Sequence, residues 1–308
     1  MRKSDLLLLA LANAIWAGQF TAVKIGLRQL GPLTIVAFPM FASAVLLGVV
    51  IQFERKRGTL RTNHFAWSDF PTGMRFLLLG LAPVVAQLGY SFGVRNSLAS
   101  TASILSLLTP VLSAIMAVLL LGERMTRLRG LSFLLAVVGA LLILGISPEI
   151  LKGMALPYLH GNFFLLIGCT GSAFYNVYSK KLLGRFSAIE VLFYSLIVSS
   201  AMLVPLAIAR EGLLIFHFSQ LTFATLICLL YIMLLSYTIA MVLFLKIIRR
   251  IDVIVASLSI YLMPVFGVLI AWVALRESLA PPAIVGGILV AAGTLLVSKF
   301  DSATTPMT

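Results

Sequence analysis

Uncharged polar and aromatic side chains placed inside long apolar runs are the residues best suited to hold a small molecule. A buried Tyr, Gln or Trp needs a partner for its hydrogen-bonding atoms. Gln87 and Ser91 are four residues apart, as are Ser257 and Tyr261, so each pair shares one face of a helix. The pattern is typical of a cavity wall, and the alternative for any single residue is a hydrogen bond between packed helices. The candidate binding residues are Trp16, Gln19, Gln87, Tyr90, Ser103, Tyr175, Asn176, Tyr231, Tyr237, Ser257 and Tyr261, with Ser91, Ser106, Thr109 and Ser236 on the same segments.

The ionisable groups that catalysis or proton transfer would require are absent from the middle of these runs. All Asp, Glu and His residues fall at the ends of the runs or between them. An enzyme would need a nucleophile with its base, or a metal cluster, and an exporter of lipophilic cations typically uses a buried carboxylate. Cys169 and Cys228 lie inside predicted helices and indicate neither a disulfide framework nor a metal site. The sequence therefore predicts no enzyme, no cofactor and no metal site.

Two lysines and two glutamates lie near the ends of the apolar runs. Lys24 and Lys180 have two interpretations: their stems lie in lipid while the ammonium groups reach the interface, or they bind a carboxylate or phosphate of the substrate. We keep both lysines among the candidate binding residues. Glu123 and Glu277 each lie beside an arginine. We interpret them as anchors that fix short turns by ion pairing rather than as proton carriers.

The elements that must position these residues are membrane-spanning helices. The chain is 61% hydrophobic and 11% charged, with a mean hydropathy of +1.09, whereas about a quarter of the residues in a soluble domain are charged. A helix crosses the hydrocarbon core with about 20 apolar residues, and the runs do not alternate as barrel strands do. Ten spans are predicted, at 5–27, 32–52, 73–94, 98–121, 129–147, 161–180, 187–209, 220–245, 253–275 and 282–299.

The basic residues are divided unequally between the two sides of these spans. Of the 23 Lys and Arg residues, 17 fall on one side and 6 on the other. Because basic loops stay in the cytoplasm, both termini are predicted to be cytoplasmic and the net charge of +13 does not indicate nucleic-acid binding. The opening MRKSDLLLLALANA has the pattern of a cleaved signal peptide, but its apolar run continues through Val23, so we expect a retained first helix.

The second half of the chain repeats the first. LTPVLSAIMAVLLLGERMT at 108–126 corresponds to LMPVFGVLIAWVALRESLA at 262–280, an offset of 154 that also aligns Gly139 with Gly293. Earlier the offset is 156, which aligns Lys24 with Lys180. Five helices per half is an odd number, so the second half, 158–301, should lie inverted relative to the first, 1–150. Inverted repeats are common in secondary transporters, with the substrate at the repeat interface. The predicted hinges are Pro110 and Pro264.

These features resemble the drug/metabolite transporter superfamily, and within it the EamA-type family. The resemblance rests on ANAIWAGQFTAVKIGL at 12–27, on the two repeated phrases with their Pro and Glu, and on GALLIL and GTLLVS. Arg276 replaces the Gly expected in the second phrase, and AFPMF at 37–41 stands where the family often has an Arg. The resemblance implies that helices 1, 3, 4, 6, 8 and 9 surround a central cavity, with helices 5 and 10 outside it.

We therefore expect an all-α integral membrane protein, with ten transmembrane helices forming two inverted five-helix repeats around a central cavity. The expected location is a bacterial inner membrane. The resemblance implies alternating-access transport of small neutral, zwitterionic or anionic metabolites, with amino acids foremost and export favoured over import. The alternative is an exporter of aromatic or toxic organic compounds. The expected partners are a small-molecule substrate and membrane lipid, and the oligomeric state is not predicted.

Overall fold

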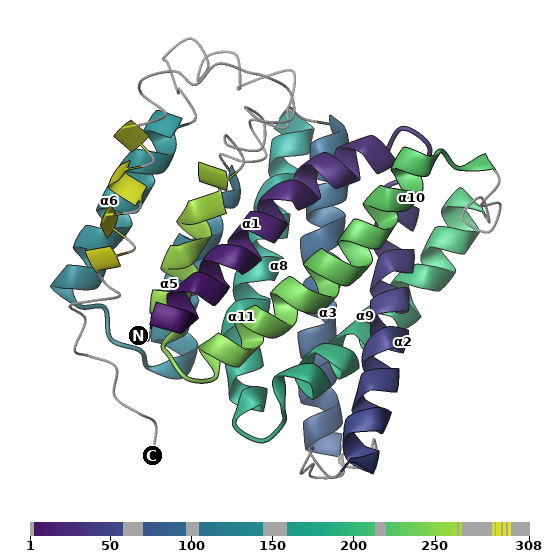
Figure 1. Ribbon diagram of the computed structural model, residues 1–308, viewed down its shortest axis with the longest axis horizontal. Coiled ribbons are helices and arrows are strands. Elements are labelled where there is room, and N and C mark those ends of the chain that lie inside the picture. Colours follow the sequence, from purple (N-terminus) through teal and green to yellow (C-terminus); the bar gives the residue numbers. More distant parts are fainter. Residues whose placement is uncertain are drawn as a thin grey trace.

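The computed structural model describes residues 3–57, 70–96, 105–143, 159–212 and 220–263, together with short helical pieces between 265 and 296. These residues contain helices and turns and no strand. Figure 1 shows the helices packed side by side and tilted against one another. The fold class is therefore all-α, as the apolar runs predict.

Most of the helices are long. The first half contains α1 (Lys3–Gly26), α2 (Thr34–Lys56), α3 (Phe70–Asn96), α5 (Leu108–Leu121) and α6 (Arg127–Ile143). The second half contains α8 (Leu159–Leu183), α9 (Ala188–Glu211), α10 (Phe223–Leu230), the π-helix η3 (Tyr231–Ala240), α11 (Met241–Ile248), α12 (Val253–Leu258) and the 3-10 helix η4 (Ser259–Tyr261). Helices α10, η3 and α11 follow one another as a single rod (Figure 1).

The outer surface of the bundle is apolar. Leu7 is 70% exposed, Leu119 76% and Phe223 78%, an arrangement that lipid stabilises and water does not. Among the described residues, five segments are long and apolar enough to cross a membrane: Ser4–Gly26, Thr34–Lys56, Phe70–Asn96, Ala188–Glu211 and Phe223–Ile248. The chain is thus built for a membrane, and the full set of ten spans stays a prediction.

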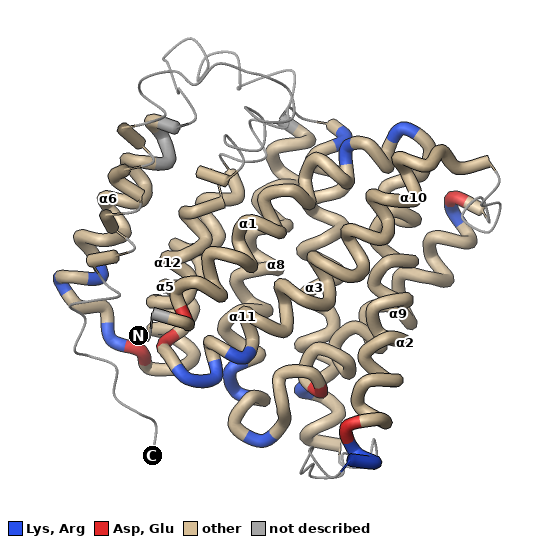
Figure 2. The backbone as a smooth tube through the Cα atoms, in the orientation of Figure 1, with Lys and Arg blue, Asp and Glu red and all other residues tan. Residues whose placement is uncertain are grey.

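Polar contacts join the helix ends into two rims. At one rim, the Glu211 carboxylate at the end of α9 accepts hydrogen bonds from the Leu33 and Thr34 N–H groups at the start of α2, at 2.9 and 2.8 Å. At the other rim, Arg55 at the end of α2 lies 3.4 Å from Glu190 at the start of α9. Figure 2 shows the charged residues near the helix ends, while the middle of the bundle is free of them.

Helices α3 and α8 approach one another through glycines. A Cβ on Gly171 of α8 would lie 2.6 Å from the Ala86 N atom of α3, and a Cβ on Gly89 would meet the backbone of Gly168. Small residues that let two backbones touch are the usual device for helix packing in lipid. At the edge of the bundle, α6 packs in the same way against the short helical pieces that contain Gly286 and Val290, because a Cβ on Gly139 would lie 2.6 Å from the Gly286 carbonyl.

The glycine contact leaves no space for a side chain, so adding even one methyl group there should push α3 and α8 apart. We expect Gly171→Ala to lower the stability of the protein by about 1–3 kcal/mol, since the backbones must move apart. The measurement is the thermal unfolding temperature in detergent, together with the yield of monodisperse protein. Gly184→Ala is the matched control, because a Cβ there meets nothing within 4 Å, and an equal loss in both variants would contradict the prediction.

Candidate functional site

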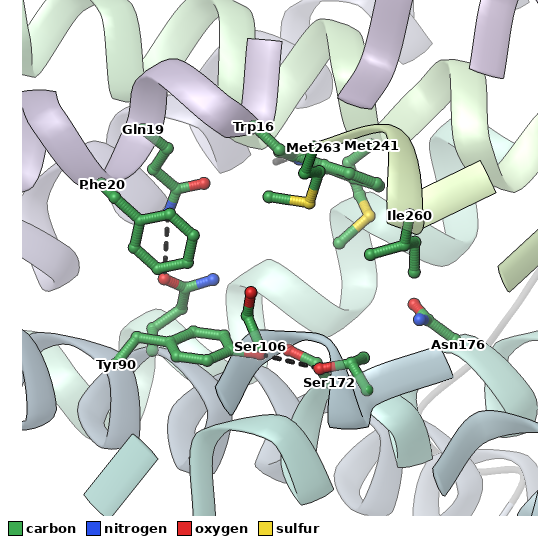
Figure 3. A pocket seen from close by; sticks show the side chains of 12 residues that line it. Trp16, Gln19, Phe20, Tyr90, Ser106, Ser172, Asn176, Met241, Ile260 and Met263 are labelled. Carbon is green, nitrogen blue, oxygen red and sulfur yellow. Dashed lines mark hydrogen bonds between the residues drawn. The ribbon is translucent and has the colours of Figure 1, made fainter. Parts of the chain in front are cut away.

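A pocket lies between α1, α3, α8, α11 and the two broken helices that contain α5 and η4 (Figure 3). Among the described residues, its lining contains amide, hydroxyl, aromatic, aliphatic and thioether groups, and no charged side chain. The lining residues are Trp16, Gln19, Phe20, Gln87, Tyr90, Ser106, Thr109, Ser172, Asn176, Met241, Ile260 and Met263.

The pocket has one apolar wall and one polar wall. In Figure 3 the apolar wall is formed by Trp16, Met241, Ile260 and Met263. Facing it are the hydroxyl groups of Tyr90, Ser106 and Ser172. The Tyr90 hydroxyl also lies 3.2 Å from Thr109 Oγ1, which fixes the tyrosine ring against the polar wall. Such a site suits a solute with one apolar edge and one edge that forms hydrogen bonds.

The two walls are built from equivalent positions of the internal repeat. Most of the lining residues form pairs at the offsets of 156 or 154, and each pair joins an apolar residue to one that forms hydrogen bonds. The pairs are Trp16 with Ser172, Phe20 with Asn176, Met241 with Gln87, Ile260 with Ser106, and Met263 with Thr109. The two halves thus bring the same positions to one pocket with opposite polarity.

A chain of side-chain amides closes the end of the pocket between α1 and α3. The Gln19 Nε2 group of α1 donates to the Gln87 Oε1 atom of α3 at 3.2 Å. The Tyr237 hydroxyl donates to the same Gln87 oxygen at 3.1 Å, and the Ser236 hydroxyl donates to the Gln19 Oε1 atom. Both acceptor positions of the Gln87 carbonyl are therefore used, while its Nε2 group has no partner among the described residues.

The π-helix η3 supplies two consecutive residues, Ser236 and Tyr237, to this hydrogen-bonded network of side chains. Wider turns of this type are rare and are frequently found at functional sites. In η3 the Thr238 hydroxyl donates to the Met233 carbonyl at 2.8 Å and lies 2.7 Å from the Ser43 hydroxyl of α2. This anchor holds the turn that directs Ser236 to Gln19 and Tyr237 to Gln87.

Both broken helices lie beside the pocket. Proline has no N–H group, so Pro110 cannot bond to the carbonyl of Ser106, four residues earlier. The helix is interrupted at Leu107 and resumes as α5, with Pro110 in its first turn. In the second half, the 3-10 helix η4 includes Ile260, which is four residues before Pro264 in the sequence. Pro264 itself lies outside the described residues.

A cluster of charges fastens the two halves together at one rim. The Lys180 ammonium at the end of α8 lies 3.1 Å from the Glu123 carboxylate after α5 and donates to the Ile251 carbonyl at 2.8 Å. Glu123 also accepts from the Val253 and Ile254 N–H groups at 2.8 and 3.0 Å, and so caps the start of α12. Beside it, the buried Arg129 guanidinium pairs with Asp252 at 2.5 Å.

The predicted binding residues fall into two groups. Trp16, Gln19, Gln87, Tyr90 and Asn176 are brought together in the pocket lining, and Tyr237 contacts it through Gln87. The others lie elsewhere, as follows.

Tyr175 is buried beside Ser195, 3.0 Å from its hydroxyl, and Tyr231 donates to the Ile15 carbonyl at 2.6 Å. Ser257 and Tyr261 are buried outside the lining, and their hydroxyls have no partner in the described part of the chain. Lys24 is exposed at the end of α1.

Lys180 is held by the charge cluster, with 9% of its side chain exposed. Glu123 is an anchor, as interpreted, but its ionic partner is Lys180 of the other half rather than the neighbouring Arg124. Ser103 and Glu277 lie outside the described residues.

Polar residues in the sequence do not indicate the apolar half of the pocket, and one lining serine also lies outside the predicted set. The apolar lining residues do not differ from the many other apolar residues of a hydrophobic sequence, and Ser172 is one of many serines. These apolar residues are Phe20, Met241, Ile260 and Met263. The repeat offset is the signal that finds them, because each is the equivalent of a lining residue in the other half.

Comparisons with known proteins find relatives that match this chain over most of its length. The EamA-like transporter family matches residues 3–145 and 159–299. The chain is 27% identical to a "Probable terminal-alkyne amino-acid exporter" of Streptantibioticus cattleyicolor over 94% of this chain and 92% of that one. It is 26% identical to an uncharacterized transporter of Archaeoglobus fulgidus over 97% and 98% of the two chains. A solved crystal structure has the same fold, with a TM-score of 0.73 over 97% of each chain at 19% identity.

The charge cluster predicts a stability effect that depends on both partners. We expect Lys180→Met to cost about 3–5 kcal/mol, because the Glu123 carboxylate keeps its buried position without a cation. The double variant Lys180→Met, Glu123→Gln should regain part of the lost unfolding temperature, since no unpaired charge remains, while the Gln amide accepts from only one of the two α12 N–H groups. Lys181→Met, at an exposed position, is the control for loss of a lysine, and a double variant no more stable than Lys180→Met would refute the account.

Proposed function

The chain belongs to the EamA-like transporter family, and from this premise we propose that it is a secondary transporter that moves small metabolites across a bacterial inner membrane by alternating access. The proposal includes ten transmembrane helices in two inverted halves, 1–150 and 158–301. It also includes cytoplasmic termini. The rim that joins the end of α2 to the start of α9 lies on the side with the larger share of basic residues, and the side richer in Lys and Arg faces the cytoplasm.

The observation that carries the proposal is the set of repeat-related pairs around one uncharged pocket. Equivalent positions of two inverted halves can meet only around the axis that relates them, and transporters of this plan bind their cargo there. Two inverted halves can also exchange conformations, so that a pocket open to one side becomes a pocket open to the other. The broken helices beside the pocket are the places where such a change would require the least loss of backbone hydrogen bonds.

The pocket favours a small zwitterionic or neutral cargo over an anion. The cavity has a volume of about 90 Å³, which is room for a small solute rather than a bulky one. An amino acid has this size. Neither Lys24 nor Lys180 belongs to the lining, so a net negative cargo would meet no cation there. An amino-acid exporter among the relatives supports this cargo and export as the direction.

The alternative is an exporter of aromatic or toxic organic compounds. The apolar wall favours it, because Trp16 offers a ring for stacking and Met241 and Met263 adapt to different shapes. The polar wall favours the amino acid. An apolar ligand would displace water from the hydroxyl and amide groups of this wall without forming hydrogen bonds in its place, which costs free energy.

Transport by purified protein in liposomes separates the two. We expect labelled L-methionine to accumulate by exchange against unlabelled L-methionine inside the vesicles, and ethidium not to move. Ser172→Trp should lower the exchange about tenfold or more by filling the polar wall. Thr170→Trp, exposed on the same helix, should leave it unchanged. Ethidium transport without amino-acid exchange would establish the alternative instead.

The inverted arrangement predicts the sides on which two equivalent residues are labelled. Thr126 and Ala280 correspond at the offset of 154. In a chain without Cys169 and Cys228, we expect Thr126→Cys and Ala280→Cys to react with an impermeant maleimide from opposite faces of the membrane. Labelling of both from one face would exclude two inverted halves.

A further inference from the structure

We propose that Gln87 selects the cargo: its Nε2 group donates hydrogen bonds to the carboxylate of a net-uncharged α-amino acid, and Tyr237 and Gln19 are positioning residues that hold the amide in this orientation. The inference rests on the proposed transport function. It adds which group of the cargo is read, by which side chain, and which charge state is accepted.

The hydrogen bonds decide which end of the Gln87 amide faces the pocket. Gln19 and Tyr237 both donate to the Oε1 atom, at 3.2 and 3.1 Å, and an amide oxygen has two acceptor positions. Rotation of the amide by 180° would place its N–H₂ group against the Gln19 Nε2 donor and leave the Tyr237 hydroxyl without its acceptor. The orientation is therefore fixed, and the two N–H donors of Nε2 remain available at the pocket. Two donors on one nitrogen match the oxygens of a carboxylate or carbonyl.

Tyr237 and Gln19 are themselves held in place. Gln19 Oε1 accepts from Ser236, the residue before Tyr237 in η3, so Gln19 must donate through its nitrogen. Tyr237 is 5% exposed, and within the described part of the chain its hydroxyl donates to Gln87 alone. The donor character of Gln87 is thus set by the π-helix on the other half of the protein.

The rest of the lining decides the charge of the cargo. No Lys, Arg, Asp or Glu belongs to the lining in the part of the chain that the structure describes. A cargo with net charge would therefore leave water and meet no opposite charge, at a high cost in an apolar surrounding. A zwitterion carries both charges itself. Asn176, 6% exposed, has no side-chain partner in the described residues, and its amide oxygen can accept from an ammonium group. In Figure 3 Asn176 and Gln19 lie at opposite ends of the pocket.

The apolar wall receives the side chain of such a cargo. Met241 and Met263 lie with Trp16 on this wall (Figure 3), and methionine fills irregular space next to flexible ligands. An unbranched apolar or thioether side chain fits this surface. L-Methionine is therefore the test ligand, and L-methioninamide is its matched analogue, since the carboxylate becomes an uncharged carboxamide.

The experiment measures binding of both ligands to purified full-length protein by calorimetry at pH 6, independently of transport. For the wild type we expect L-methionine to bind about tenfold more tightly than L-methioninamide. Gln87→Glu should reverse the preference, because its carboxylate repels the carboxylate of methionine and accepts from the carboxamide and the ammonium; the ratio should change roughly a hundredfold. Gln87→Met, which copies the equivalent Met241, should reduce L-methionine binding about tenfold.

Tyr237→Phe tests the positioning role. Without the hydroxyl donor, Gln19 alone holds the Gln87 oxygen, so the amide rotates more readily and can present its oxygen to the carboxamide. The preference for L-methionine should therefore fall roughly three- to tenfold, with little loss of binding to L-methioninamide. A structural defect alone would weaken both ligands equally, and that result would remove Tyr237 from the proposal.

The outcomes separate this inference from the function on which it rests. Gln52→Glu, the same substitution at an exposed position of α2, controls for the added charge and should match the wild type. An unchanged preference in Gln87→Glu, with amino-acid exchange intact in liposomes, would overturn the role of Gln87 and leave the transporter standing. A wild type that neither binds nor exchanges any amino acid would overturn both.

Discussion

The interaction on which the structure depends is the hydrogen bond made inside an apolar surrounding. Each polar atom taken into hydrocarbon without a partner costs several kcal/mol, so polar side chains must find partners within the bundle. The partners come from distant parts of the chain: Gln19 with Gln87, Glu211 with the start of α2, and Glu123 with the start of α12. Contacts of this kind fix which helices are neighbours, whereas apolar contact with lipid or with another helix differs little in energy.

Duplication and divergence account for the character of the pocket. The two halves supply equivalent positions to its lining, and the substitutions between them have made one wall apolar and the other polar, as in Met241 and Gln87 or Met263 and Thr109. A symmetric pocket would offer the same groups to both ends of a ligand. The asymmetry gives the site a direction, which a ligand with unlike ends can use.

The sequence predicts the helices and their order well and the contacts of single residues less well. Long apolar runs locate α1, α2, α3, α8 and α9, and the polar residues inside them include those that reach the pocket, such as Gln87 and Asn176. The direction of each side chain is harder to predict, because these helices are apolar on every side and have no hydrophobic stripe to mark an inner face. For this reason the sequence pattern groups Tyr175 and Tyr261 with Tyr90, although they are buried elsewhere. No sequence pattern predicts the π-helix η3 either, since its widened turns depend on hydrogen bonds to α1 and α2, which are distant in the sequence.

The π-helix also has a consequence for how cargo preference can change. One extra residue per turn alters the rotational phase of the rod, so a deletion of a single codon in η3 would turn α11 by ~100° relative to α10. Met241 would then leave the pocket, and Phe244 would lose its ring contact with Trp16 at 5.3 Å, while new side chains entered the lining. A length change of one residue, away from most of the lining, is therefore a route by which this architecture can acquire a different cargo while its fold is kept.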